Sequence, residues 1–151
     1  MHKITIRPAE STDKKALEEV QWRASLSNPE DRDALLANPD AIEISLQQIA
    51  SGGIFVAEEL GSVIGFAAIL ARSDGDSELD ALFVEPGSWR QGVGRALVEH
   101  CCQMVKALGA TALHVVGNPH AQGFYEACGF KLVGTTQMRF GVGILMRRYL
   151  Q

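Results

Sequence analysis

The sequence predicts one mixed α/β domain in which a mostly antiparallel sheet is flanked by helices. Three observations lead to this fold class: β-branched runs at hairpin spacing, a long helical stripe after a glycine-rich loop, and the absence of a repeat or linker. The 151 residues suit a single domain with its own core. We therefore expect one domain over residues 1–151.

The chain opens with a strand and a helix. Residues 4–7 alternate between apolar and polar side chains, and Pro8 ends this run. Apolar residues then recur at helical spacing and predict a helix over residues 13–26. These residues are Leu17, Val20 and Ala24.

Prolines among charged residues interrupt this pattern over residues 28–40, where we expect a loop with one short turn. A second helix is predicted after it, because helical spacing returns and the pair Gly52-Gly53 then ends it. Its apolar residues are Ile42, Leu46 and Ile49.

Three strands at hairpin spacing follow, over residues 54–58, 63–71 and 78–84. Turn residues separate them, with Gly61 in the first turn and residues 73–76 in the second. Strands joined by such short turns pair with their neighbours in opposite directions. We expect an antiparallel meander.

A long helix comes next, and Gly109 ends it. Its predicted apolar stripe recurs every three or four residues and consists of Val93, Leu97, Cys101, Met104 and Leu108. A strand is expected over residues 111–116. Asn118 and Pro119 then favour the start of a short helix that ends before Gly129. The final strands are expected over residues 130–136 and 142–149.

Charge and composition exclude some classes of function. The net charge is −4, from 14 basic and 18 acidic residues, so the chain lacks the basic character of a protein that binds nucleic-acid phosphates. No apolar run approaches the ~20 residues that span a bilayer. The three cysteines have no zinc-like spacing and are typical of reduced thiols in a cytoplasmic protein.

The segment over residues 82–97 runs from a strand through a loop into the long helix. The first N–H groups of a helix lack internal partners, and the helix dipole makes that end positive. Gly92 and Gly94 allow an anion to approach these N–H groups, and Arg90 and Arg95 add positive charge. A pyrophosphate fits this pattern. The alternative is a loop that needs glycine only for tight packing.

A second motif begins at Asn118 and contains the aromatic pair Phe124-Tyr125 before the exit Gly129-Phe130. Together the two segments resemble the cofactor-binding core of the GNAT superfamily of N-acetyltransferases. That pattern is Arg/Gln-x-x-Gly-x-Gly/Ala at a helix start, then Asn-x-x-Ala-x-x-Phe-Tyr ending in Gly-Phe. The close match covers residues 78–134. It departs at Trp89, which stands where the family usually has Arg or Gln.

The resemblance implies a fold with a V-shaped splay between strands 4 and 5 and acetyl-CoA as co-substrate, without a metal. The pantetheine arm would lie along residues 82–84, and an N–H near Val84 would hold the acetyl carbonyl. Tyr125 would protonate the leaving sulfur as general acid, or else be an ordinary helix residue. The implied cofactor-binding residues are Leu82, Phe83, Val84, Arg90, Gln91, Gly92, Val93, Gly94, Arg95, Asn118 and Tyr125.

Three residues are candidates for the general base that deprotonates the amine. Glu78 and Asp80 share one face of a strand that borders the acceptor site in the family. His114 lies on the strand after the long helix and belongs to a residue type suited to proton transfer at neutral pH. The carboxylates are equally consistent with a solvated strand end, and the histidine with a half-buried ring.

The acceptor is expected to be an amine of a small molecule or of a protein, near Trp22, Arg23 and residues 28–40. Neither nucleic acid nor a membrane is expected as a partner, and a homodimer is left open. Two alternatives to an enzyme remain, namely an acyl-CoA sensor of the same fold without activity and a binding module without CoA. The cysteines fit core positions, which favours direct transfer in a ternary complex.

Overall fold

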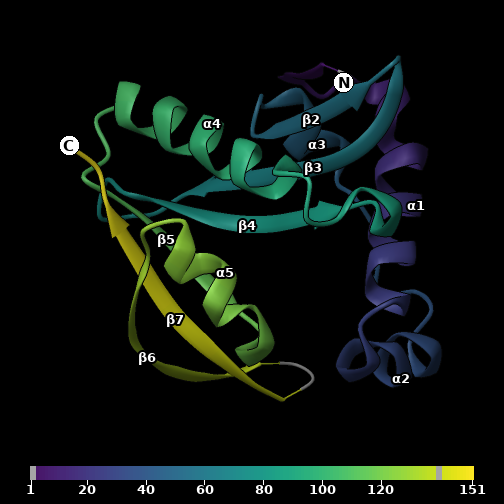
Figure 1. Cartoon of the computed structure of the whole chain (residues 1–151). Coiled ribbons are helices and arrows are strands. Elements are labelled where there is room, and N and C mark those ends of the chain that lie inside the picture. Colours follow the sequence, from purple (N-terminus) through teal and green to yellow (C-terminus); the bar gives the residue numbers. More distant parts are fainter. Residues whose placement is uncertain (1–2, 139–140) are drawn as a thin grey trace. The chain divides into compact units, whose positions relative to one another are not determined.

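The computed structural model describes residues 3–138 and 141–151. Seven strands form one sheet (Figure 1). Their hydrogen-bonded order is β1 (Ile4–Pro8), β2 (Ile54–Glu59), β3 (Ser62–Ala71), β4 (Ser77–Val84), β5 (Ala112–Gly117), β7 (Gly141–Tyr149) and β6 (Lys131–Met138). The registered neighbours are antiparallel apart from β4 with β5, which are parallel. The predicted mixed, mostly antiparallel α/β fold is confirmed.

The contacts divide the chain into two compact units, which are described separately below. The first consists of Met1–Ala68 and Ala81–Leu97, and the second of Ile69–Asp80 and Val98–Gln151. Strands β3 and β4 therefore contribute residues to both units. The single domain expected from the sequence stays a prediction. Among residues 3–138 and 141–151, the helices are too short or too polar to cross a membrane.

Helices α1, α2 and α3 lie within the first unit, and the last two differ from the sequence prediction. Helix α1 (Lys14–Leu26) lies where it was expected. Residues 28–40, expected as a loop, contain α2 (Pro29–Ala37), because Asn28 is extended, Pro29 occupies the first turn and Leu35 is buried. The expectation of a loop was wrong.

Helix α3 (Leu46–Ala50) begins four residues later than the spacing from Ile42 indicated. The Ser45 hydroxyl accepts a hydrogen bond from the Gln48 N–H at 3.2 Å and so fixes the helix start. Apolar side chains of α1, α3, β2 and β3 form the core of this unit, among them Leu17, Val20, Ile49, Val56 and Phe66.

Helix α4 (Val93–Ala107) begins in the first unit and continues in the second. Met104 and Leu108 were predicted on its apolar stripe, but they are 39% and 77% exposed. The other three predicted positions are buried, and three further residues are buried beside them; the six are Val93, Leu97, Cys101, Val98, Cys102 and Val105. The buried residues follow the 3.6-residue period of an α-helix. The last two predicted positions, Met104 and Leu108, fall outside this buried face.

The second unit also contains α5 (Gln122–Ala127), which follows a 3-10 turn over Pro119–Ala121. Strand β5 pairs with β7 from Ala112–Tyr149 to Gly117–Ile144. The parallel pairs of β4 with β5 run from Ser77–Leu113 to Leu79–Val115, and β4 continues to Val84. The three cysteines are free thiols in buried positions, as expected.

Candidate active site

The loop between β4 and α4 is anchored within the first unit by main-chain hydrogen bonds. Directly after β4, the Glu85 N–H donates to the Ile64 carbonyl at 2.8 Å. A 3-10 turn covers Pro86–Ser88, and the Trp89 N–H donates back to the Pro86 carbonyl at 3.2 Å. The loop then enters α4, in the strand–loop–helix order that the sequence predicted.

Two residues of this loop have a left-handed backbone: Arg90 with φ 65° and Gly92 with φ 84°. Glycine adopts this conformation freely, whereas a residue with a Cβ pays about 1–2 kcal/mol. A Cβ at Gly92 would meet no atom within 4 Å. The backbone direction therefore requires this glycine, and tight packing does not.

The N–H groups that open α4 remain available. The Gly92 carbonyl accepts from the Ala96 N–H at 3.0 Å and closes the first turn. Within the described part of the chain, no backbone or side-chain acceptor pairs with the N–H groups of Val93, Gly94 or Arg95. The side chains of Arg90 and Arg95 are exposed. Free donors, a positive helix end and two guanidinium groups together fit a pyrophosphate.

Trp89 has a role that the sequence did not indicate. Its indole Nε1–H donates to the Val84 carbonyl at 2.7 Å, so the side chain ties the loop to the end of β4. The ring is 39% exposed. The sequence identified the unusual residue type at this position but gave no partner for it, because the partner is a main-chain oxygen set by the loop conformation.

A second contact at this loop was also missed. The Arg23 guanidinium on α1 donates to both carboxylate oxygens of Glu85, at 2.6 and 2.9 Å. The bidentate pair joins residues that are 62 positions apart in the chain, and such a separation leaves no local pattern in a sequence. It connects α1 directly to the residue after β4.

The remaining loop and strand residues expected at the cofactor site all lie in the first unit. Leu82, Phe83 and Val84 are half-buried on β4. The Val93 side chain is 1% exposed and belongs to the core, so this residue offers a ligand only its main chain. Gln91 is exposed, and its amide nitrogen lies 3.5 Å from the Gly87 carbonyl oxygen.

Two of the three candidate bases lie next to each other in the second unit. Glu78 on β4 is the registered partner of His114 on β5. Registered neighbours present their side chains to the same face of a sheet, and both residues are half-buried. Asp80 is exposed and lies beyond the last registered pair, Leu79 with Val115.

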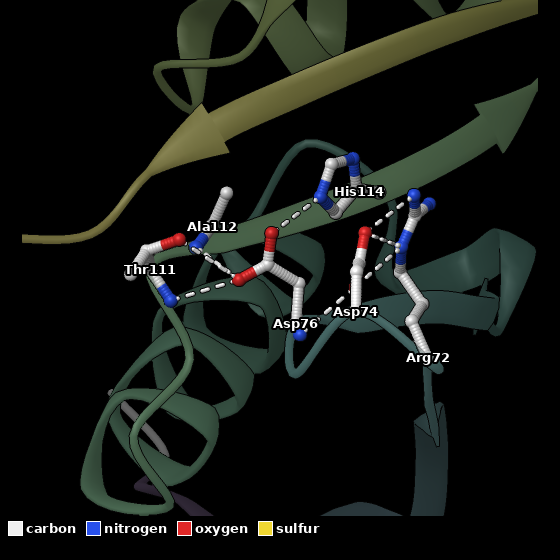
Figure 2. A network of polar contacts seen from close by, with 6 residues as sticks. All are labelled: Arg72, Asp74, Asp76, Thr111, Ala112 and His114. Atoms are coloured by element: carbon white, nitrogen blue, oxygen red, sulfur yellow. Dashed lines mark hydrogen bonds and ion pairs between the residues drawn. The ribbon is translucent and has the colours of Figure 1, made fainter.

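The His114 ring is held by a residue that the sequence did not single out. The His114 Nε2 atom lies 3.0 Å from Oδ2 of Asp76, in the turn before β4 (Figure 2). Oδ1 of Asp76 accepts from the Thr111 N–H at 2.9 Å, the Thr111 hydroxyl at 2.9 Å and the Ala112 N–H at 3.1 Å. The His114 contact, followed by these hydrogen bonds, holds the pKa of Asp76 far below its usual range.

Asp74, Asp76 and His114 also bring three potential metal ligands within 4.8 Å of one another. Each carboxylate already has partners, since Asp74 pairs with Arg72 at 3.0 Å and accepts from the Asp76 N–H at 3.0 Å (Figure 2). An ion-pair and hydrogen-bond network accounts for this arrangement, and we assign no metal to it.

Tyr125, the expected general acid, lies on α5 with its ring 8% exposed. It packs edge-on against Phe124 and Phe130, with ring centroids 5.2 and 5.5 Å away. A Cβ on Gly117 of β5 would lie 3.1 Å from the tyrosine ring, so glycine is needed there for this packing. Burial raises the pKa of Tyr125 to about 12.

Asn118 precedes the 3-10 turn in extended conformation, and its carbonyl accepts from the Ala121 N–H at 2.9 Å. Its side chain makes no capping hydrogen bond to the turn. Asn118 thus occupies the expected N-cap position, with Pro119 in the first turn, but without a side-chain cap. The cofactor contact stays a prediction.

An open groove of about 230 Å³ lies in the first unit, along α1. It includes Trp22 and Arg23, which were expected near the acceptor amine. The residues that line it are Lys15, Glu18, Glu19, Trp22, Arg23, Pro39 and Ile42. Its charges are balanced, with two acidic and two basic side chains, so the groove has no strong preference for one sign of charge.

Residues 15–130 match the model of the acetyltransferase (GNAT) family. The chain belongs to this family. The match covers both the glycine loop and the Asn118–Tyr125 region, and it confirms the resemblance drawn from these motifs. An acyltransferase is thereby confirmed at the level of the family.

Curated relatives agree with this GNAT assignment over part of their length. An uncharacterized N-acetyltransferase of Mycobacterium tuberculosis is 32% identical over 91 residues, and the match covers 58% of the GNAT chain and 58% of the relative. The peptidyl-lysine N-acetyltransferase YjaB of Escherichia coli is 40% identical over 60 residues, or 40% of each chain. The matched region is thus well short of these relatives' full length.

Solved structures share the fold along nearly the whole GNAT chain. PaiA N-acetyltransferase of Thermoplasma acidophilum, solved with coenzyme A, superposes with a TM-score of 0.80 at 20% identity, over 97% of this chain and 99% of that one. The ribosomal-protein-S18-alanine N-acetyltransferase of Escherichia coli has a TM-score of 0.72 at 24% identity, over 99% and 95%. At these identities the likeness shows the fold.

Proposed function

We propose that this GNAT protein transfers the acetyl group of acetyl-CoA directly to a primary amine. The observation that carries the proposal is the start of α4, where the N–H groups of Val93, Gly94 and Arg95 have no acceptor among the described residues and a Cβ on Gly92 would meet no atom within 4 Å. A pyrophosphate satisfies these donors and the two exposed arginines at once.

The residues proposed to hold the co-substrate act mostly through the main chain. Gly92, Val93, Gly94 and Arg95 would bind the pyrophosphate through their N–H groups, with Arg90 and Arg95 adding charge. The strand residues Leu82, Phe83 and Val84, together with Gln91 and Asn118, complete the proposed binding set. Bound acetyl-CoA supplies the activated thioester for amide formation.

The proposed reaction requires two proton transfers, one from the amine and one to the leaving sulfur. An alkylamine with a pKa near 10.4 is about 3.4 units from neutrality at pH 7, so its deprotonation costs about 4.6 kcal/mol. Glu78, Asp80 or His114 would take the proton that the amine loses as the C–N bond forms. Tyr125 would donate to the sulfur as the C–S bond breaks.

Direct transfer in a ternary complex is favoured over an acetylated cysteine. Cys101 is 0% exposed, and burial raises the pKa of its thiol to about 12. Because the thiolate is the nucleophile, such a cysteine cannot attack a thioester at neutral pH. This supports direct attack of the amine on the thioester.

For the acceptor we propose a protein amine ahead of a small molecule. Two relatives are named for acetylating proteins, one at peptidyl-lysine and one at the alanine of ribosomal protein S18. A lysine side chain and an α-amino group present the same nucleophile, a primary amine on a flexible or terminal segment. The open groove along α1 gives room for such a segment.

Thermal shift and thiol release test the proposal together. Acetyl-CoA at 100 times its dissociation constant should stabilise the fold by about 2.7 kcal/mol, and CoA should act similarly. Gly92→Glu should abolish this shift, because it places a carboxylate among the phosphate-facing N–H groups. Release of free thiol should appear with peptides bearing lysine or an N-terminal alanine, and be weaker with small amines.

Each outcome of these two assays distinguishes between the proposed enzyme and its alternatives. A folded Gly92→Glu variant with unchanged acetyl-CoA affinity would exclude this pyrophosphate site. Binding without turnover on any amine would make the protein an acyl-CoA sensor. No shift with acetyl-CoA would leave a binding module that uses the glycine loop structurally.

A further inference from the structure

Asp76 divides its two carboxylate oxygens between two tasks. Oδ1 accepts three hydrogen bonds from Thr111 and Ala112 at the start of β5, while Oδ2 lies 3.0 Å from Nε2 of His114 (Figure 2). The Oδ1 contacts join the turn to the start of β5, and the Oδ2 contact holds the imidazole of His114.

An ionised carboxylate can only accept hydrogen bonds, so Nε2 of His114 must carry the proton that faces Asp76. A neutral imidazole has one protonated nitrogen, which leaves Nδ1 with its lone pair. The second ring nitrogen points away from Asp76 (Figure 2). Within residues 3–138 and 141–151, no side chain or backbone group is hydrogen-bonded to Nδ1.

The His114 side chain is 17% exposed, so a molecule outside the protein can reach it. Its neighbours on the same face are Glu78 on β4 and Arg147 on β7, which are its registered partners on either side. A basic nitrogen without a protein partner, held in one tautomer on an accessible sheet face, is arranged to accept a proton from something that binds there.

We propose that Asp76 is a positioning residue for acetyl transfer, which holds His114 in the Nε2–H tautomer so that Nδ1 is the base for the acceptor amine. This inference rests on the proposed function and selects one of its three candidate bases. As the amine nitrogen attacks the thioester carbonyl, the C–N bond forms and the amine proton passes to Nδ1. The C–S bond breaks, the thiolate leaves and takes up a proton, and His114 later returns its proton to water.

Asp76→Asn is the decisive variant. The amide oxygen can keep the hydrogen bonds from Thr111 and Ala112, but the amide NH₂ then faces Nε2, which must accept. The proton moves to Nδ1, and the base is lost. We expect kcat/KM with the amine to fall by a hundredfold or more, with the melting temperature little changed.

Asp74→Asn is the matched control, since it removes the same charge from the same turn and leaves the contact between Asp76 and His114 intact. Its activity should stay within about twofold of the wild type. His114→Ala should lose about as much activity as Asp76→Asn, and the double variant should be no slower than His114→Ala, because Asp76 acts through His114.

Nitrogen-15 NMR of the imidazole gives a readout that needs neither turnover nor a folded variant of Asp76. The neutral His114 ring of the wild type should be protonated at Nε2, and a ring protonated at Nδ1 would overturn the inference.

The kinetic outcomes separate the two proposals. A wild type that acetylates amines beside an equally active Asp76→Asn variant refutes the role of Asp76 and leaves the proposed function standing. Additive losses in the double variant refute the path through His114. A wild type without turnover on any amine refutes the proposed function and this inference with it.

Discussion

Tyr125 combines a tightly packed ring with a hydroxyl that stays protonated at every ordinary pH. Burial raises its pKa from 10.0 to about 12, above the pKa of about 8.5 of a cysteine thiol, so full proton transfer to a thiolate is uphill. Donating a hydrogen bond to the sulfur as negative charge develops there requires less free energy than full proton transfer. The raised pKa is therefore compatible with the proposed role of Tyr125 as a hydrogen-bond donor to the leaving thiolate.

Tyr125→Phe removes the hydroxyl and keeps the ring between Phe124 and Phe130. We expect kcat to fall tenfold to a hundredfold, with little change in the KM for acetyl-CoA or in the melting temperature. Tyr149→Phe is the matched control, because Tyr149 is the other tyrosine of the chain and is 63% exposed. Equal kcat values for the two variants in a thiol-release assay would remove Tyr125 from the chemistry.

Residue types could be predicted from the sequence where they form a local motif, and their partners could not. The glycines before α4 and the Phe124-Tyr125 pair lie within short patterns. Asp76 was read only as a turn residue, because its partner His114 lies 38 positions away in the chain. Side-chain pairing of this kind depends on the strand register, which no local pattern encodes.

At the scale of elements, the loop into α4 depends on the left-handed backbone at Gly92, with φ 84°. Gly92→Ala should lower the free energy of unfolding by about 1–2 kcal/mol in urea, since a Cβ disfavours this conformation. Gly87→Ala in the same loop is the control: its φ is not left-handed, and an added Cβ has no neighbour within 4 Å. Equal stabilities of the two variants would show that the loop is not held in this conformation.

Strands and long helices could be predicted from periodicity. The elements that were predicted wrongly depend on sequence features of only one or two residues. Helix α2 was missed because charged residues and two prolines resembled a loop, although Pro29 is favoured in a first helical turn. The start of α3 is set by one serine hydroxyl. Met104 and Leu108 show that apolar spacing alone does not decide which side of a helix is buried.

At the scale of the whole molecule, buried and paired ionisable groups set the limits of stability against pH. Tyr125 and Cys101 have pKa values raised from 10.0 and 9.0 to about 12, so their neutral forms are favoured in the fold. Their contribution is complete below pH 9 and is lost as the pH rises toward 12. Asp13 has a lowered pKa because it accepts hydrogen bonds from Arg7, so its contribution is present above pH 3.8 and is lost on acidification.

Stability should therefore be highest and nearly flat around neutral pH. Between pH 9 and 12 the free energy of unfolding should fall by several kcal/mol, of which Tyr125 accounts for about 2.7 kcal/mol. Urea unfolding at pH 7, 10 and 11.5 measures this change. Tyr125→Phe should show a shallower alkaline loss than the wild type, and identical slopes would contradict the assignment.

Trp89 makes the loop between β4 and α4 observable in solution. The chain has two tryptophans, so Trp22→Phe leaves a single indole emitter, partly exposed and hydrogen-bonded to the carbonyl that ends β4. Its fluorescence then depends on the few residues that are proposed to hold the nucleotide. An unlabelled protein can thus be titrated with CoA analogues and followed by emission wavelength, with the reporter already built into the loop.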